Sequence, residues 1–143
     1  MAVPTAMELL GRSNMKRHNP MPVLKSYDAI YAHGVEVPSS ARIIYVSGQV
    51  GVGSDGRVVD GGFEAQCRQA IANVEAVLAS SRMTLNDLVK ITVFLTRRED
   101  LPLLRDVRAN HLAVAPAVTV IIVAGLHDPD WLVEIEAVAA TET

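Results

Sequence analysis

Two apolar runs near the C-terminal end carry the clearest pattern in the chain. Residues 116–123 read PAVTVIIV and residues 131–140 read WLVEIEAVAA, with the polar loop GLHDPD between them. Both runs are rich in β-branched residues and are bounded by turn formers, so we expect two strands of one sheet. Alternation then places Glu134 and Glu136 on one face of the second strand, about 7 Å apart. Carboxylates on an otherwise apolar face need water or a partner, which directs the search for function to this strand.

The first third of the chain predicts short strands and turns. Residues 23–31 form a weak strand candidate, and residues 42–46 (RIIYV) form a strong one. The strong strand runs into a break of small residues, Ser47-Gly48-Gln49, before a further strand at residues 50–52. The tight-turn signal Ser54-Asp55-Gly56 follows, so we expect hairpins in this region.

Residues 61–81 change to a helical period. Apolar residues recur there at three- and four-residue spacing, which predicts an amphipathic helix; they are Phe63, Cys67, Ala70, Ile71, Val74, Val77 and Leu78. Cys67 lies on the buried stripe of this helix. A reactive thiol needs an electropositive, accessible setting, so we expect Cys67 to be a core residue.

A second helix is expected from Asp100 to about Leu112, after a helical turn at residues 85–88 and an alternating strand at residues 89–95. Asp100 can cap its first turn, which also tolerates the proline at position 102. His111 falls on the apolar side of the helix and is expected to be structural. No second histidine or carboxylate stands at ligand spacing, so we expect no metal site.

This order of elements predicts an α+β two-layer sandwich. Each helix links two strands, so we expect crossover connections with both helices on one face of a mixed sheet. No segment is then left to cover the other face, which suggests self-association. The length of 143 residues fits one domain. We take it as residues 21–143, preceded by an arm or leader over residues 1–20 that we expect to be flexible.

Composition narrows the function classes. Thirteen Lys and Arg residues against sixteen Asp and Glu residues give a net charge of −3, which argues against a general nucleic-acid binder. The single cysteine excludes an intramolecular disulfide. No apolar run approaches the roughly 18 residues of a membrane helix. We therefore expect a protein of the cytoplasm without a membrane or nucleic-acid partner.

Five stretches of the sequence share their order and spacing with the motifs of a known family. They are SGQV at residues 47–50, QCRQAIANVEAVL at 66–78, VKITVFL at 89–95, Pro-Ala at 116–117 and VEIEAVA at 133–139. Together they resemble the reactive-intermediate deaminase (Rid) family, also called YjgF/YER057c/UK114, over roughly residues 27–140. The resemblance implies a chorismate-mutase-like α+β fold, a homotrimer with small-molecule sites in the clefts between subunits, and no cofactor. Active members hydrolyse 2-imino or enamine acids to 2-keto acids and ammonia.

The resemblance also assigns roles to individual residues. Glu134 takes the place of the carboxylate that positions water, and Gly48 that of a glycine whose backbone lies against the substrate. Tyr31 matches the tyrosine before a glutamine–glycine pair, in which His33 replaces the glutamine. Val120 takes the place of a residue that helps to hold substrate and water.

Val118 departs from the family pattern. Two residues after the proline, active members carry an arginine that clamps the substrate carboxylate, whereas valine offers no donor. An arginine–carboxylate fork is among the strongest charge-assisted contacts, and each charged hydrogen bond is worth about 1.5–3 kcal/mol. We therefore expect a substrate that differs from the ordinary 2-imino acid, for example one that lacks the carboxylate.

Three functions stay open from the sequence. The first is an imine or enamine hydrolase with an atypical substrate, in which Glu134 acts as the base in a half-closed apolar cleft and Glu136 is structural. The second is a trimeric ligand-binding or regulatory protein without turnover. The third is endoribonuclease activity, a label that some relatives carry, which an acidic chain with few aromatic residues supports poorly.

Other readings of the charged residues also stay open. Glu134 and Glu136 can instead pair with lysine or arginine across a subunit boundary. Arg42, Arg105 or Arg108 from another subunit can supply a partner for a substrate carboxylate. His127 is a further polar candidate for the cleft, although we expect it to be exposed in its loop.

Overall fold

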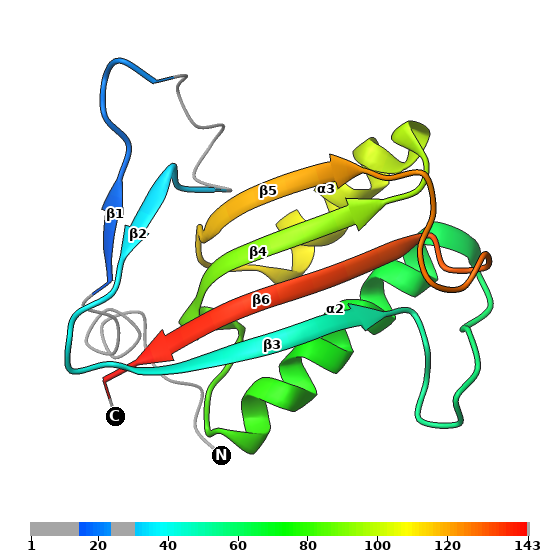
Figure 1. Cartoon of the computed structure of the whole chain (residues 1–143), viewed down its shortest axis with the longest axis horizontal. Coiled ribbons are helices and arrows are strands. Elements are labelled where there is room, and N and C mark those ends of the chain that lie inside the picture. Colours follow the sequence, from blue (N-terminus) through cyan, green and yellow to red (C-terminus); the bar gives the residue numbers. More distant parts are fainter. Residues whose placement is uncertain (1–14, 24–30, 143) are drawn as a thin grey trace.

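The structure, a computed structural model, describes residues 15–23 and 31–142. Most of the strand expected over residues 23–31, and the first fourteen residues of the arm, lie outside this part of the chain. A four-stranded sheet with two helices on one face dominates the described residues, and a two-stranded ribbon stands beside it (Figure 1). The expected α+β sandwich is confirmed.

The sheet is mixed, with strand order β3-β6-β4-β5. Its strands are β3 (Arg42–Val50), β4 (Leu88–Leu95), β5 (Ala117–Ile122) and β6 (Val133–Thr141). Strand β6 pairs antiparallel with β3 and β4, whereas β4 and β5 are parallel. Helix α2 (Gly62–Ser80) links β3 to β4, and helix α3 (Leu101–His111) links β4 to β5. Short 3-10 turns, η1 (Leu85–Asp87) and η2 (Arg98–Asp100), precede β4 and α3. Both helices therefore serve as crossovers, as predicted.

The core lies between the helices and one face of the sheet. The side chains of Leu78 in α2, Val93 in β4 and Val133 in β6 are completely buried there. Burial alternates along β6, with Glu134 and Glu136 on the opposite face, as the sequence predicts. Cys67 is also completely buried, and its burial raises the pKa of the thiol to about 12. It is a core residue, as expected.

The face of the sheet turned away from the helices, called the open face below, is only partly covered. Ile43 and Tyr45 of β3 are 48% and 78% exposed on it, because they alternate with Ile44 and Val46, which face the core. Such apolar exposure on one face is typical of an interaction surface.

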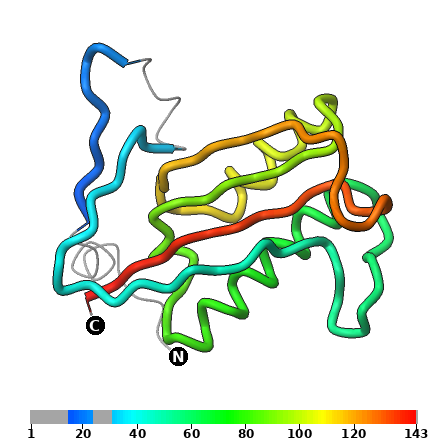
Figure 2. Tube along the Cα trace, in the orientation of Figure 1, coloured from blue at the N-terminus to red at the C-terminus, as the bar shows by residue number. Residues whose placement is uncertain are grey.

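The ribbon of β1 (Lys16–His18) and β2 (Gly34–Glu36) stands beside one end of the sheet (Figure 2), and residues of this region pack onto that end of the open face. Met15 is 8% exposed, and Val35 packs with it against Val89 and Ala140 of the sheet. The expectation that no segment covers this face is therefore wrong at that end. It failed because residues 15–18, assigned to the arm, supply a strand and a buried side chain.

Two local predictions in the first half of the chain also differ from the structure. Residues 42–50 form one strand rather than two, and its partner is β6 rather than a neighbouring hairpin strand. The turn at residues 54–56 closes only a single bridge, between Val52 and Val58. Small residues predicted a break at residues 47–49, but the chain passes through them with a β-bulge.

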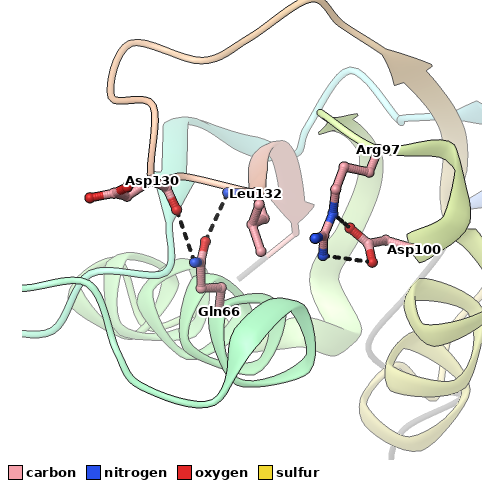
Figure 3. A network of polar contacts seen from close by, with 5 residues as sticks. All are labelled: Gln66, Arg97, Asp100, Asp130 and Leu132. Carbon is pink, nitrogen blue, oxygen red and sulfur yellow. Dashed lines mark hydrogen bonds and ion pairs between the residues drawn. The ribbon is translucent and has the colours of Figure 1, made fainter.

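Asp100 stands at the start of α3 without capping it. Its carboxylate is buried and accepts two hydrogen bonds from Arg97, from Nε at 2.8 Å and from a terminal nitrogen at 3.0 Å (Figure 3). The capping role is therefore wrong, because the neighbouring guanidinium takes both carboxylate oxygens. His111 places its Nδ1 at 2.8 Å from the Val107 carbonyl, which agrees with a structural role.

Candidate functional site

Gly48 and Glu134 meet on the open face, where β3 and β6 run side by side. The register of the two strands shifts between Val46 and Gln49, so a bulge turns Gly48 toward β6. A Cβ atom on Gly48 would lie 2.7 Å from Cδ and 3.0 Å from Oε1 of Glu134. Only a glycine leaves room for the carboxylate in this position. The structure thus brings together two residues that the sequence assigns to the site.

The Glu134 carboxylate stands in an apolar row across the sheet. Val50 of β3 and Phe94 of β4 are its direct neighbours, and Ile121 of β5 follows Phe94. Glu134 is partly buried in this row, whereas Glu136 is exposed. Within the described residues, no lysine or arginine forms an ion pair with either carboxylate. Glu134 therefore offers its oxygens to a molecule on the open face.

Gln66 of α2 fixes the backbone just before Glu134. The side chain is 5% exposed, its amide nitrogen donates to the Asp130 carbonyl at 3.1 Å, and its oxygen accepts from the Leu132 nitrogen at 2.9 Å (Figure 3). It also packs tightly against β3, since a Cβ on Gly51 would lie 2.5 Å from the Gln66 backbone. The buried amide therefore fixes the segment that leads into Glu134, while the Gln66 backbone lies close to Gly51, just after the end of β3.

Asn73, seven residues later on the same side of α2, fixes the backbone at the end of β3. Its side-chain nitrogen donates to the carbonyls of Val50 and Val52 at 3.0 Å each. Its oxygen accepts from Gln69 at 2.8 Å. No sequence pattern described above pointed to Gln66 or Asn73. Two amide side chains spaced by seven residues on a helix are the signal that points to them, because this spacing repeats one face.

Tyr31 and His33 lie at the edge of the sheet, beside β5. Ala32 between them bridges Ala117, and its nitrogen donates to the Pro116 carbonyl at 2.9 Å. The rings of Tyr31 and His33 meet edge to face with centroids 5.4 Å apart. Asn19, just after β1, accepts a hydrogen bond from the His33 nitrogen at 2.9 Å. The ribbon and the β5 edge therefore hold this aromatic pair in place.

Val118 and Val120 alternate with Thr119 along β5 and face the helix-covered side. Val118 stands opposite the buried Ile91 and packs against the core. Val120 is 36% exposed at the edge of that face. Val118 is therefore separated from Glu134 by the sheet itself, and position 118 supplies the core with an apolar side chain.

The candidate residues form two groups within one chain. The register places Ala32 about 19 Å from Glu134, since three strand spacings and four residues separate them. A small molecule cannot contact Glu134 and the Tyr31–His33 pair of the same chain at this distance. One group is thus Gly48 with Glu134, and the other is Tyr31 with His33.

The remaining candidates stand elsewhere. Arg42 donates to the hydroxyl and carbonyl of Ser81, both at 3.3 Å. Arg108 faces the interior beside Cys67, and burial lowers the pKa of its guanidinium. The Arg108 residue is partly buried there. His127 is exposed as predicted, with its ring 6.0 Å from that of Trp131, and Arg105 is exposed on α3.

Neither a metal-binding cluster nor a membrane-spanning helix occurs in the described part of the chain. No cluster of three or more histidine, cysteine or acidic side chains there has the arrangement of a metal site. No helix there has the length and apolar character needed to span a membrane.

Comparison with known proteins identifies the family. A family model described as endoribonuclease L-PSP matches residues 26–141. A crystal structure of a Rid family protein, YyfB of Yersinia pestis, has a TM-score of 0.79 and 30% identity, over 89% of this chain and 98% of that one. The chain belongs to the Rid family. The resemblance of its sequence motifs is thereby confirmed.

Other similar proteins include one that is named for an activity and one whose crystal structure holds a bound ligand. The 2-iminobutanoate/2-iminopropanoate deaminase of mouse is 34% identical over 111 residues, which cover 76% of this chain and 79% of that protein. A RutC family protein of Pyrococcus horikoshii is 29% identical over 104 residues, or 72% and 82% of the two chains. The crystal structure of Escherichia coli TdcF with bound serine has a TM-score of 0.63 and 30% identity, over 76% and 86% of the chains.

Proposed function

We propose that the protein is an imine or enamine hydrolase whose substrate differs from that of relatives with an arginine at position 118. The reaction converts an imine and water into a carbonyl compound and ammonia. Membership of the Rid family and the name of the mouse relative support this class of reaction. The single observation that carries it is the Gly48–Glu134 pair, in which a glycine leaves space for a carboxylate on an apolar face.

The chemistry needs only a water molecule and a group that moves its proton. Glu134 accepts a proton from the water as the water oxygen bonds to the imine carbon. Glu134 passes this proton to the imine nitrogen, giving an amino alcohol at the same carbon. It then accepts the hydroxyl proton and delivers it to the nitrogen as the C=O bond forms, the C–N bond breaks, and ammonia leaves. No electrons are gained or lost, so the step needs no oxidant or reductant.

We further propose that the complete site forms between copies of the chain, in a closed homotrimer. The separation of about 19 Å within one chain supports this, because residues at that distance cannot share one small substrate. The open face supports it as well. Tyr45, Lys90 and Glu136 line a hollow there, so a second copy meets both apolar and oppositely charged groups on this surface.

Val118 supports a change of substrate. The valine stands in the core-facing row of β5, where a guanidinium would have to leave water. A substrate of this protein is therefore not held by a cation at that position. A trimeric binding protein without turnover is the second candidate, and the same observation favours it, because loss of the clamp removes binding energy for a 2-imino acid.

A coupled assay tests the hydrolase. An amino-acid oxidase generates imines in place from several amino acids, an amine oxidase generates uncharged imines, and semicarbazide competes for them. We expect the wild type to lower semicarbazone formation from at least one imine. Glu134→Ala should lower that rate by about 10²–10⁴-fold. Glu136→Ala is the matched control and should keep a rate near that of the wild type. If the wild type leaves every imine to semicarbazide but binds a carbonyl compound, the binding protein is correct and the hydrolase is not.

A further inference from the structure

Arg17 is directed toward the body of the protein, unlike its neighbours in β1. It pairs with Val35 of β2, and residues directly opposite in an antiparallel pair project to the same side. Val35 and Met15, which is two residues before Arg17, both pack against the sheet. Lys16 and His18 alternate with them and face outward. Arg17 therefore extends into the angle between the ribbon and the main sheet.

The guanidinium of Arg17 is anchored at the start of β5. Its Nε donates to the Ala115 carbonyl at 2.9 Å. Ala115 comes two residues before Ala117, which pairs with Ala32 between Tyr31 and His33. One hydrogen bond thus places the cation at the same end of β5 as the aromatic pair of the candidate site. The bond uses Nε and leaves the two terminal nitrogens, with their donors, to other partners.

The charge of Arg17 is not balanced within the described part of the chain. No carboxylate there pairs with it, and its side chain is exposed. The nearest acidic residue in the ribbon, Glu36, is engaged with His18 at 2.8 Å. An acidic protein therefore presents a local cationic group at the end of β5 that Ala32, between Tyr31 and His33, also contacts.

We propose that Arg17 binds the negatively charged end of the ligand and sets its specificity for carboxylates. The inference rests on the proposed function for the position of the site, and it names the substrate class. An arginine fork is suited to a planar carboxylate, to which it can donate two parallel hydrogen bonds. Because the cation stands on the ribbon and not at position 118, the ligand carries its carboxylate at a different place from an ordinary 2-imino acid. The substrate is thus an imino acid whose carboxylate reaches the ribbon, and the corresponding oxo acid is the product.

Equilibrium binding tests the role of Arg17 without relying on turnover. The probes are 2-oxobutanoate and 4-oxopentanoate, which separate carbonyl and carboxylate by different lengths, and their uncharged methyl esters. Titrations followed by NMR or calorimetry compare the wild type with Arg17→Gln, which removes the charge but retains a donor for Ala115. Arg17→Lys tests rescue by a conservative cation, and Lys16→Gln is the matched control on the outer side of β1.

We expect Arg17→Gln to weaken the better-bound acid by about 10- to 100-fold, as expected for lost charged hydrogen bonds. The methyl ester should bind equally to both proteins, Arg17→Lys should recover part of the affinity, and Lys16→Gln should bind as the wild type does. Equal affinity of Arg17→Gln and wild type for both acids would overturn the proposal, as would binding of neither acid by the wild type. An equal loss in Lys16→Gln would also do so, because it would show a general effect of ribbon charge.

Failure of this inference and failure of the hydrolase are distinguishable. If the wild type hydrolyses imines and Arg17→Gln does so with unchanged KM, the hydrolase stands and Arg17 has no role in binding. If no imine is hydrolysed but Arg17→Gln loses affinity for the acid and not for its ester, the carboxylate site stands and the hydrolase does not.

Discussion

Gly48 lies so close to Glu134 that a methyl group on its Cα would overlap the carboxylate. The three nearest atoms to such a group all belong to the Glu134 side chain, at 2.7 to 3.0 Å. The bulge in β3 produces this approach, since it turns Gly48 toward β6 where a regular strand would not. The space left by one missing side chain thus determines where the carboxylate of another can stand.

Gly48→Ala should displace the Glu134 carboxylate and lower activity more than stability. The clash involves the far end of a flexible side chain, so the fold can accommodate it at about 0.5–1.5 kcal/mol for a strained rotamer. A shift of about 1 Å in a catalytic group can cost about 10²-fold in rate. Imine hydrolysis and thermal unfolding are the measurements. Gly125→Ala is the matched control, because a Cβ there meets no atom within 4 Å.

A double-mutant cycle on the same pair separates the contact from the backbone. Gly48→Ala should lose its cost in unfolding free energy when Glu134→Ala is also present, because the colliding atoms are then gone. An unchanged cost in the double variant would show that the strain at Gly48 comes from its backbone and not from Glu134.

Gln66→Leu should destabilise the protein by about 1–3 kcal/mol. Leucine fills a similar volume, but the Leu132 N–H and the Asp130 carbonyl lose their partner. Chemical denaturation is the measurement. Glu75→Leu makes a comparable change on the exposed side of α2 and should stay within about 0.5 kcal/mol. Equal effects of the two variants would show that the buried amide has no special role.

The buried thiol of Cys67 should make the protein less stable at alkaline pH. Burial raises the pKa of its thiol from 9.0 to about 12, so between these values the unfolded chain is ionised and the folded chain is not. The unfolded state then binds fewer protons, and the unfolding free energy falls by about 1.4 kcal/mol per pH unit in that window. Denaturation from pH 8 to 11 should show a steeper decline for the wild type than for Cys67→Ala. Parallel curves would contradict the assignment.

Mixed oligomers should reveal whether the site forms between copies. Glu134→Ala and Tyr31→Ala each remove one of the two groups and should be nearly inactive alone. When the two variants are co-expressed and the mixed trimers are selected through both of their tags, about a third of the sites should combine intact halves from neighbouring copies. Recovered activity supports the shared site. If mixed oligomers stay inactive, all groups of the site belong to one chain.

The sequence predicted those parts of the fold where residue type follows burial. The period of α2 and the alternation of β6 identified buried residues correctly, because each apolar position there faces the core. The face of Val118 was not predictable, since β5 is apolar on both sides and its alternation carries no direction. Gln66 was missed because a hydropathy pattern assigns a polar amide to the surface, whereas Gln66 is buried. Its hydrogen-bond partners are backbone atoms, which no residue type in the sequence indicates.

The candidate site was predictable only in part. Motif order pointed to Gly48 and Glu134, and the structure places them together. Arg17 carried no signal, because its position depends on strand pairing between β1 and β2 and on a carbonyl 98 residues away in the chain. Contacts between distant segments are set by tertiary packing, which no local pattern records.

The central claim concerns one of two carboxylates that differ only slightly in position. Glu134 and Glu136 lie on the same face of β6, but only Glu134 meets Gly48. The most direct test compares kcat for imine hydrolysis in Glu134→Gln and Glu136→Gln, which remove one proton acceptor each and keep the side-chain volume. We predict a loss of about 10²–10⁴-fold for Glu134→Gln and a rate near that of the wild type for Glu136→Gln. Equal rates in both variants would contradict the account.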